Sequence, residues 1–178
     1  MQDHGNTLAF LGANSFGPSR YWATEDSPGT NGYDAARMAQ EIAKARKEAD
    51  VVFVEYQADE VYDYAPDETN RTIFRRTMAD GADVVTGVQN HHPAAVEFSD
   101  DGKKIILYGL GNLFFDQMFS DEVRQGLIAR HTIYDGHLIQ TELLTTMLEY
   151  AAQPRWATPA EREQILRAVF TASGFKVP

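Results

Sequence analysis

Apolar and polar positions form alternating blocks along the chain, and each block predicts a strand or a helix. Short apolar runs at residues 7–11 (TLAFL), 51–54 (VVFV) and 82–87 (ADVVTG) are typical of strands, and the run at 51–54 fits a strand covered on both faces. Between these runs, apolar side chains recur at spacings of three and four, which predicts helices that begin after Asp34 and Asp67. This order favours an α/β fold with a mostly parallel sheet flanked by helices.

The second half of the chain has a pattern typical of antiparallel hairpins. Residues 95–98 and 104–108 flank the turn-forming sequence Ser-Asp-Asp-Gly. Residues 126–134 and 137–144 flank Asp-Gly, which is the strongest short-range hairpin signal in the chain. We expect these antiparallel hairpin strands to extend the sheet.

A proline and a capping motif mark the C-terminal part of the chain. Pro154 breaks the strand pattern, and Thr158 with Glu161 has the spacing of a capping box at the start of a helix. We interpret residues 1–178 as a single domain in which residues 154–178 are a C-terminal helical extension.

Composition limits the classes of partner and the kinds of site. The chain has 16 Lys and Arg against 26 Asp and Glu, and the resulting net charge of −10 disfavours nucleic acid as a partner. Because the chain has no cysteine, disulfides, thiolate metal sites and a cysteine nucleophile are excluded. We expect a soluble globular chain, since no apolar run approaches the roughly 20 residues of a membrane-spanning helix and the N-terminus lacks a basic signal region. Composition leaves the compartment open.

Polar side chains follow the second and third predicted strands, at the edge where α/β sheets place their sites. After the second strand come Glu55, Tyr56, Gln57, Asp59 and Glu60, and after the third come Gln89, Asn90, His91 and His92. Carboxylates bind hard cations or act as acid and base, and imidazole is a preferred ligand of zinc, manganese and iron. Acidic loop residues are equally often only solvated, and one histidine is a weak metal signal. These residues alone therefore predict a polar pocket and no specific reaction.

Three longer blocks make the chain similar to a known family. VVFVEYQADEVYDYAPDE, TMADGADVVTGVQNHHPAAVEF and YGLGNLFFDQM resemble, in order and spacing, the C-terminal half of the CapA family of capsule and poly-γ-glutamate synthesis proteins. Those proteins have a calcineurin-like metallophosphatase fold. The resemblance implies that the chain is the C-terminal portion of a CapA-like protein and forms half of a metallophosphatase-like sandwich.

The same resemblance implies a location and partners. The location is the bacterial cell envelope, outside the cytoplasm. The missing N-terminal half of the family fold, or self-association, would cover this half of the sandwich. An anionic or carbohydrate polymer of the envelope is the candidate ligand.

Two family blocks, HWGxE and GHHPH, assign the catalytic and metal-binding residues. Glu60 and His91 are retained, and the resemblance implies that both are catalytic. Three family histidines are replaced, namely by Tyr56, Val88 and Gln89. The resemblance thus implies a degenerate site, in which His91 and Gln89 bind a divalent metal (manganese, zinc or magnesium) weakly.

The resemblance also assigns a set of polar substrate-binding residues: Tyr56, Gln57, Gln89, Asn90 and Asn112. Three functions stay open. The chain is a degenerate-site protein of polymer biosynthesis or export, an active metal-dependent phosphoesterase completed by its N-terminal half, or a metal-free polymer-binding module with aromatic stacking surfaces. The rings available for stacking are Tyr56, Tyr62, Tyr64 and Phe115. We expect Glu60, Gln89 and His91 to converge at the carboxyl ends of neighbouring strands, because their segments follow the two most buried predicted strands.

Overall fold

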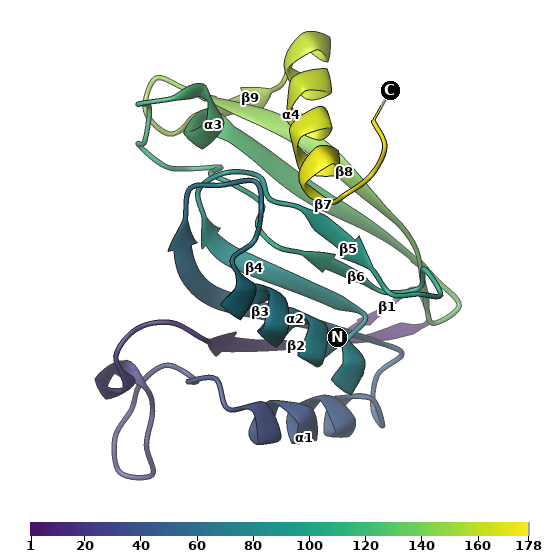
Figure 1. The fold of residues 1–178 in the computed structure, drawn as a ribbon. Helices are drawn as coiled ribbons and strands as arrows, with labels where there is room; N and C mark the ends of the chain where they lie inside the picture. Colours follow the sequence, from purple (N-terminus) through teal and green to yellow (C-terminus); the bar gives the residue numbers. More distant parts are fainter. Residues whose placement is uncertain (178) are drawn as a thin grey trace.

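The computed structural model describes residues 1–177, and its centre is a six-stranded sheet with the order β1-β2-β3-β4-β6-β5 (Figure 1). β2, β3, β4 and β6 run parallel to one another, and β1 and β5 pair antiparallel at the two edges. The strands are β1 Gln2–Asp3, β2 Asn6–Asn14, β3 Val51–Val61, β4 Val84–Asn90, β5 Val96–Phe98 and β6 Ile105–Leu107. The predicted α/β class with a mostly parallel sheet is confirmed.

Two helices, α1 Ala35–Ala45 and α2 Glu68–Asp80, cover one face of this sheet (Figure 1). Each begins where its sequence predicts, because the carboxylates of Asp34 and Asp67 accept hydrogen bonds from backbone N–H groups in the first turn. Ile42 of α1 and Phe74 of α2 are fully buried against the strands. Burial of these apolar faces holds both helices on the sheet.

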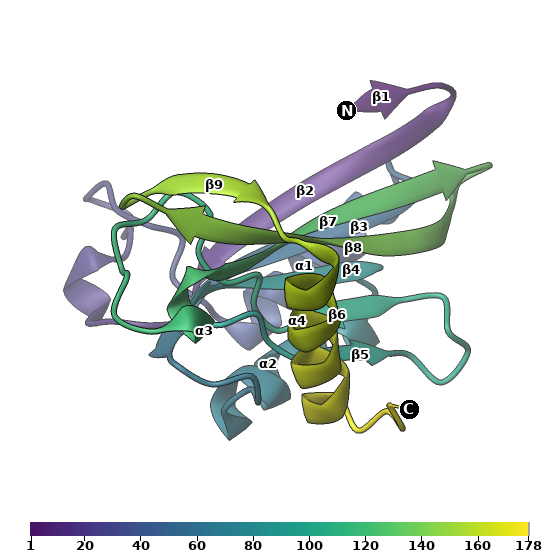
Figure 2. The ribbon, with the colours of Figure 1, turned by 90° about the horizontal axis from the view of Figure 1, so that it is seen from above.

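Antiparallel strands form a second, separate sheet with the order β7-β8-β9. β7 Gln125–Tyr134 and β8 His137–Glu149 make the predicted Asp-Gly hairpin, and β9 Gln153–Trp156 pairs with β8. The expectation that this hairpin extends the main sheet is wrong. Leu127 and Met147 instead pack against Val84 and Ile105, whose side chains lie on the face opposite the α1 and α2 core (Figure 2).

The other predicted hairpin does extend the main sheet. β5 pairs antiparallel with β6 from Val96–Leu107 to Phe98–Ile105, and β6 pairs with β4 in parallel. This hairpin therefore sits at the edge of the main sheet remote from β1.

Three further helices complete the described chain. They are the short η1 Ser19–Tyr21 in the long loop after β2, α3 Asp121–Arg124 before β7, and α4 Pro159–Ala172. The predicted capping box of Thr158 and Glu161 is present, and Ile165 and Val169 of α4 are fully buried against both sheets. The expectation that Pro154 interrupts the strand pattern is wrong. Pro154 lies within β9, which is an edge strand, and an edge strand tolerates a residue without a backbone N–H. None of the helices in residues 1–177 is both long enough and apolar enough to cross a lipid bilayer.

β3 is longer than its apolar run predicts. Tyr56 and Ala58 are buried while Glu55 and Gln57 are exposed, which is the period of two that a strand with one open face shows. Parallel pairing with β4 continues to Gln57, and after an irregularity Val61 pairs with Asn90. The polar residues expected in a loop therefore stand on a strand, which holds them more rigidly.

Candidate functional site

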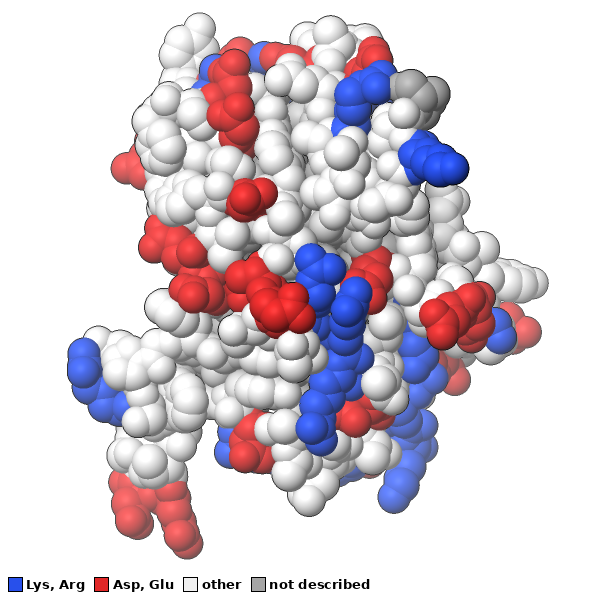
Figure 3. All heavy atoms as spheres, in the orientation of Figure 1, with Lys and Arg blue, Asp and Glu red and all other residues white. Residues whose placement is uncertain are grey.

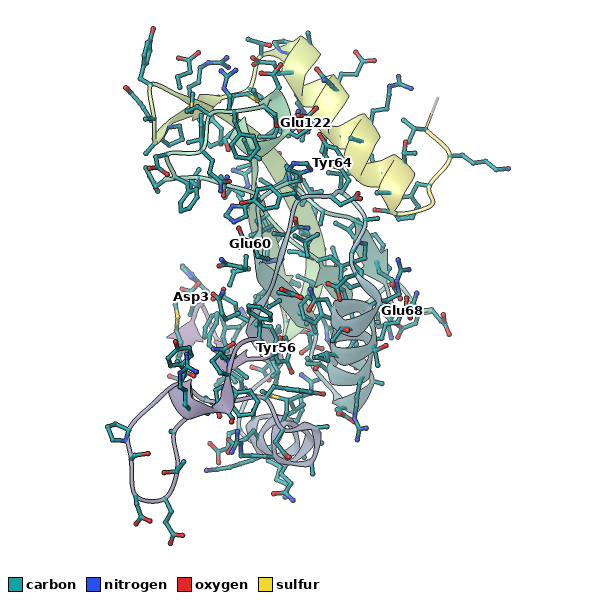
Figure 4. The ribbon with its side chains drawn as sticks, turned by 60° about the vertical axis from the view of Figure 1, so that its left-hand side comes forward. Asp3, Tyr56, Glu60, Tyr64, Glu68 and Glu122 are labelled. Carbon is teal, nitrogen blue, oxygen red and sulfur yellow. The ribbon has the colours of Figure 1, made fainter. Side chains whose placement is uncertain are left out.

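His91 and Glu60 form the centre of the candidate site. Glu60 stands near the end of β3 and His91 directly follows β4, so the parallel pairing of these strands brings the two residues to one edge of the sheet. His91 Nε2 lies 3.3 Å from Glu60 Oε1. The His91 side chain is 7% exposed and the Glu60 side chain is 49% exposed, so the imidazole is buried and the carboxylate is accessible to solvent. In Figure 4, Glu60 lies on the outer side of the molecule, at a level between Tyr56 and Tyr64.

Asn112 fixes the orientation of the His91 ring. The Asn112 amide nitrogen donates a hydrogen bond to the Val123 carbonyl at 2.9 Å, and the amide oxygen lies 2.9 Å from His91 Nδ1. Because that oxygen is an acceptor, His91 Nδ1 carries a proton and donates it. Nε2 faces Glu60 Oε1, and it donates to that oxygen when the ring carries both protons; in the neutral ring it is the nitrogen with the lone pair. Asn112 thus presents the ligand-binding or proton-accepting atom of His91 to the open side of the site.

Tyr62 and Gln117 hold the Glu60 carboxylate. The Gln117 amide nitrogen donates to the Tyr62 hydroxyl at 2.7 Å, and that hydroxyl donates to Glu60 Oε1 at 2.7 Å. The hydrogen bond to Glu60 raises the pKa of Tyr62 above its ordinary value, so the hydroxyl remains a donor. Sequence reasoning missed this arrangement, because nothing in the local pattern links Gln117 to Tyr62, which lies 55 residues earlier.

Aromatic rings form a wall beside the polar pair. Tyr62 stacks on His91 with 4.7 Å between ring centroids, and Phe115 contacts the other side of the site at 5.3 Å from the imidazole. Tyr62 and Phe115 are each about two-fifths exposed, and Phe114 and Phe119 of the same loop are about seven-tenths exposed. The site therefore combines hydrogen-bonding groups with open apolar ring faces.

Gln57 and Gln89 lie at the same edge, linked to each other. The Gln57 amide nitrogen donates to the Gln89 side-chain oxygen at 2.8 Å. Gln89 has a backbone φ of 88°, which is an uncommon conformation for a residue other than glycine. Asn90 is buried, and its amide donates to the Asp63 carbonyl at 3.1 Å, so it ties the end of β4 to the loop after β3.

Tyr56 lies away from these groups. Its side chain is on the helix-covered face of the sheet, fully buried, with the hydroxyl 2.7 Å from Thr77 Oγ1 and the ring stacked on Phe74. Burial raises the pKa of Tyr56 to about 12. The structure thus does not bring Tyr56 to the site, and we do not carry its expected substrate contact or stacking role forward.

The described residues do not complete a catalytic metal site. His91 and Glu60 supply two adjacent ligand atoms, but residues 1–177 contain no group of three or more His, Cys, Asp or Glu side chains placed to share a metal. A catalytic zinc normally has three protein ligands, and a two-metal centre needs more. The donor set of this chain alone therefore does not fit the metal centre that the resemblance implies.

Comparison with known families identifies the chain. The family model described as "Bacterial capsule synthesis protein PGA_cap" matches residues 4–117, which is more than half of the chain. The chain belongs to this capsule synthesis family. The PGA_cap match includes Glu60, His91, Asn112 and Gln117, whereas the second sheet and α4 follow it in the sequence.

Two curated relatives, both named for capsule or PGA biosynthesis, are similar to about three quarters of this chain. The chain is 30% identical over 134 residues to the "PGA biosynthesis protein CapA" of Bacillus subtilis (strain 168), which covers 75% of this chain and 34% of that protein. It is 28% identical over 137 residues to the "Capsule biosynthesis protein CapA" of Bacillus anthracis, with 74% and 33% covered. The chain thus spans about a third of the length of the curated relatives it matches.

Proposed function

We propose that this PGA_cap chain acts in the biosynthesis or export of a bacterial capsule or poly-γ-glutamate at the cell envelope, outside the cytoplasm. Within that process it binds polymer at the His91 and Glu60 site and does not by itself hydrolyse a substrate. Membership of the capsule synthesis family supports the process, and the printed names of both relatives point to the same biosynthesis. The incomplete metal-ligand set supports binding over hydrolysis.

The observation that carries the proposal is the fixed pair of His91 Nε2 and Glu60 Oε1 beside open aromatic faces. Asn112 and Tyr62 orient one member each, so the two groups are arranged before any ligand arrives. Pre-arranged polar groups lower the entropy cost of binding, and ring faces such as that of Phe115 add apolar contact. Gln57, Gln89 and the exposed part of Glu60 offer further hydrogen bonds along the same edge.

A second candidate function is a metal-dependent phosphoesterase completed by further chain. Two ligand atoms on one tetrahedral metal, with bonds of about 2.0–2.1 Å, are separated by roughly 3.3 Å. His91 Nε2 and Glu60 Oε1 have this separation, and the bond from Nδ1 to Asn112 is of the kind that orients metal-bound histidines. The remaining ligands would come from the N-terminal half of the family fold.

An apolar groove between the two sheets supports a covering partner. The groove has a volume of about 720 Å³, and Phe10, Phe53 and Ile133 are among the side chains that line it. Phe10 is 60% exposed although its ring stacks on Phe53 at 4.9 Å. Large exposed apolar surfaces of this kind are typical of interfaces. We propose that the N-terminal half of the family fold, or a second copy of the chain, covers this groove.

The test of the proposed function uses the whole protein in a capsule-producing cell. His91→Ala and Glu60→Gln should each lower surface polymer, while His137→Ala, at an exposed histidine that begins β8, should leave it unchanged. Loss of one hydrogen bond to a charged group weakens binding by about tenfold to a hundredfold. Phosphodiesterase and phosphomonoesterase assays of the same proteins, with added manganese and zinc, separate the two candidates. Unchanged polymer in the His91→Ala cells would contradict the binding role, and hydrolysis lost in that variant would support the phosphoesterase.

A further inference from the structure

A second hollow, distant in sequence from the His91 site, lies between β5, β8, α4 and the C-terminal tail. Its volume is about 440 Å³, which is within the range of small-molecule sites. Leu143 of β8, with Leu166 and Phe170 of α4, forms much of its apolar lining. Ile165 and Val169 of the same helix point into the core, so α4 uses one face for folding and the adjacent face for the hollow.

The C-terminal tail closes one side of this hollow. Gly174 has a φ of 81°, which lets the chain reverse at the end of α4, and Phe175 N then donates to the Phe170 carbonyl at 2.9 Å. The Phe175 ring packs 6.0 Å from Phe170 and 6.4 Å from Phe98, measured between centroids. The turn at Gly174 thus builds a wall of the hollow.

The charge around the hollow is opposite to that of the chain. Where residues 1–177 line the hollow, they contribute two cations, Arg162 and Lys176, and no side-chain carboxylate, although the chain has a net charge of −10. Within residues 1–177, neither cation forms an ion pair; Arg162 Nη1 donates to the Leu143 carbonyl at 2.9 Å, which holds the guanidinium at the rim with other N–H groups available. Figure 3 shows the surface beside α4 and the tail, at the upper right, as mostly white, with blue and some red atoms at its border.

We propose that this hollow binds a free aliphatic carboxylate with a single chain of medium length. The chain would occupy the apolar hollow, and the carboxylate would accept hydrogen bonds from Arg162 and Lys176. A neutral ligand would leave the two cations unused, and a cationic one would be repelled by them. This site is independent of His91 and Glu60 and does not depend on the polymer-binding proposal.

Calorimetric titration with dodecanoate below its micelle concentration tests the proposal. We expect one dodecanoate per chain and at least tenfold weaker binding of dodecyltrimethylammonium, which has the same tail and the opposite charge. The double variant Arg162→Gln/Lys176→Gln should weaken dodecanoate binding by about tenfold, because each exposed ion pair contributes modestly. Arg167→Gln is the matched control on the same helix, since its guanidinium pairs with Glu163. His91→Ala should bind dodecanoate like the wild type.

Three results would overturn the proposal. One is equal affinity for the two amphiphiles, which would show that the cations do not select the ligand. Another is unchanged dodecanoate affinity in the double variant. The third is binding to vesicles of anionic phospholipid without binding of monomeric dodecanoate, which would assign the hollow to a membrane surface. Because Arg162, Arg167 and Lys176 are exposed, the double variant and Arg167→Gln should keep the unfolding temperature of the wild type.

Discussion

Glu161 joins the start of α4 to the second sheet, and Glu161→Gln tests how much that junction stabilises the fold. Its two carboxylate oxygens accept hydrogen bonds from the Arg155 guanidinium of β9, each at 2.7 Å, and Oε2 also accepts one from the Thr158 backbone N–H at 2.7 Å. The hydrogen bonds from Arg155 lower the pKa of Glu161 from its ordinary 4.5 to about 2. Glutamine keeps the size of the side chain but removes its charge.

The magnitude follows from the difference between these pKa values. A difference between 4.5 and about 2 corresponds to roughly 3.4 kcal/mol for a fully enclosed group, at about 1.36 kcal/mol per pKa unit. Glu161 is 28% and Arg155 34% exposed, so solvent screens the interaction, and we expect about 1–2 kcal/mol. Because the folded-state pKa is the lower one, this stabilisation is complete above pH about 4.5 and is lost as the pH falls toward 2.

Urea unfolding of the wild type and Glu161→Gln, measured between pH 7 and pH 3, gives the free energies to compare. Glu163→Gln is the matched control on the same helix, since Glu163 is 72% exposed and meets Arg167 at 3.2 Å in a surface pair. This control should change the free energy of unfolding by less than about 0.5 kcal/mol. The difference in the free energy of unfolding between the wild type and Glu161→Gln should become smaller as the pH falls from 7 to 3.

Two results would refute this reasoning. If Glu161→Gln destabilises the protein no more than Glu163→Gln does, the Arg155 contacts do not stabilise the junction. If the difference stays constant from pH 7 to pH 3, the charge of Glu161 is not its source.

Two further substitutions, both measured by urea unfolding, test the support of the His91 site. Gly126→Ala should cost about 1–3 kcal/mol, because the added Cβ would meet the backbone carbonyl oxygen of Asn112 even more closely than Thr146 Oγ1, which is at 2.6 Å. Gly12→Ala, whose nearest contact is at 3.8 Å, should cost less than about 0.5 kcal/mol, and equal costs would show that close approach is not the reason. Asn112→Ala should cost about 2–3 kcal/mol, because it leaves the buried Nδ1–H of His91 and a backbone carbonyl without partners. Asn112→Ala within 0.5 kcal/mol of the wild type would mean that these hydrogen bonds do not hold the site.

Local features of this fold were predictable from the sequence, since they depend on residues close together in the chain. The caps at Asp34 and Asp67, the capping box at Thr158 and the turn at 135–136 each involve neighbours a few positions apart. The placement of the second sheet was not predictable in this way. A hairpin with an apolar face is equally able to join a sheet edge or to pack on a sheet face, and only the long-range contact of Leu127 with the main sheet decides between them.

The candidate site was likewise predictable in part, and its long-range contacts were not. The meeting of His91 and Glu60 follows from parallel strands ending at one edge, so topology and family resemblance together predicted it. Tyr62 follows β3 directly, but Asn112 and Gln117 arrive from the loop after β6, and the role of Gln117 depends on how that loop folds back. Tyr56 was misplaced because the period of two in β3 turns its side chain to the helix-covered face.

Calorimetric titration of the chain with Zn²⁺ and Mn²⁺ tests most directly whether the His91 and Glu60 site is a polymer-binding site and not, in this chain alone, a catalytic metal site. With two ligand atoms from His91 and Glu60, we expect weak binding of either metal that is lost in His91→Ala and kept in the control His137→Ala. Stoichiometric, sub-micromolar binding by the wild type that disappears in His91→Ala would contradict the account and restore metal-dependent hydrolysis as the function of this chain.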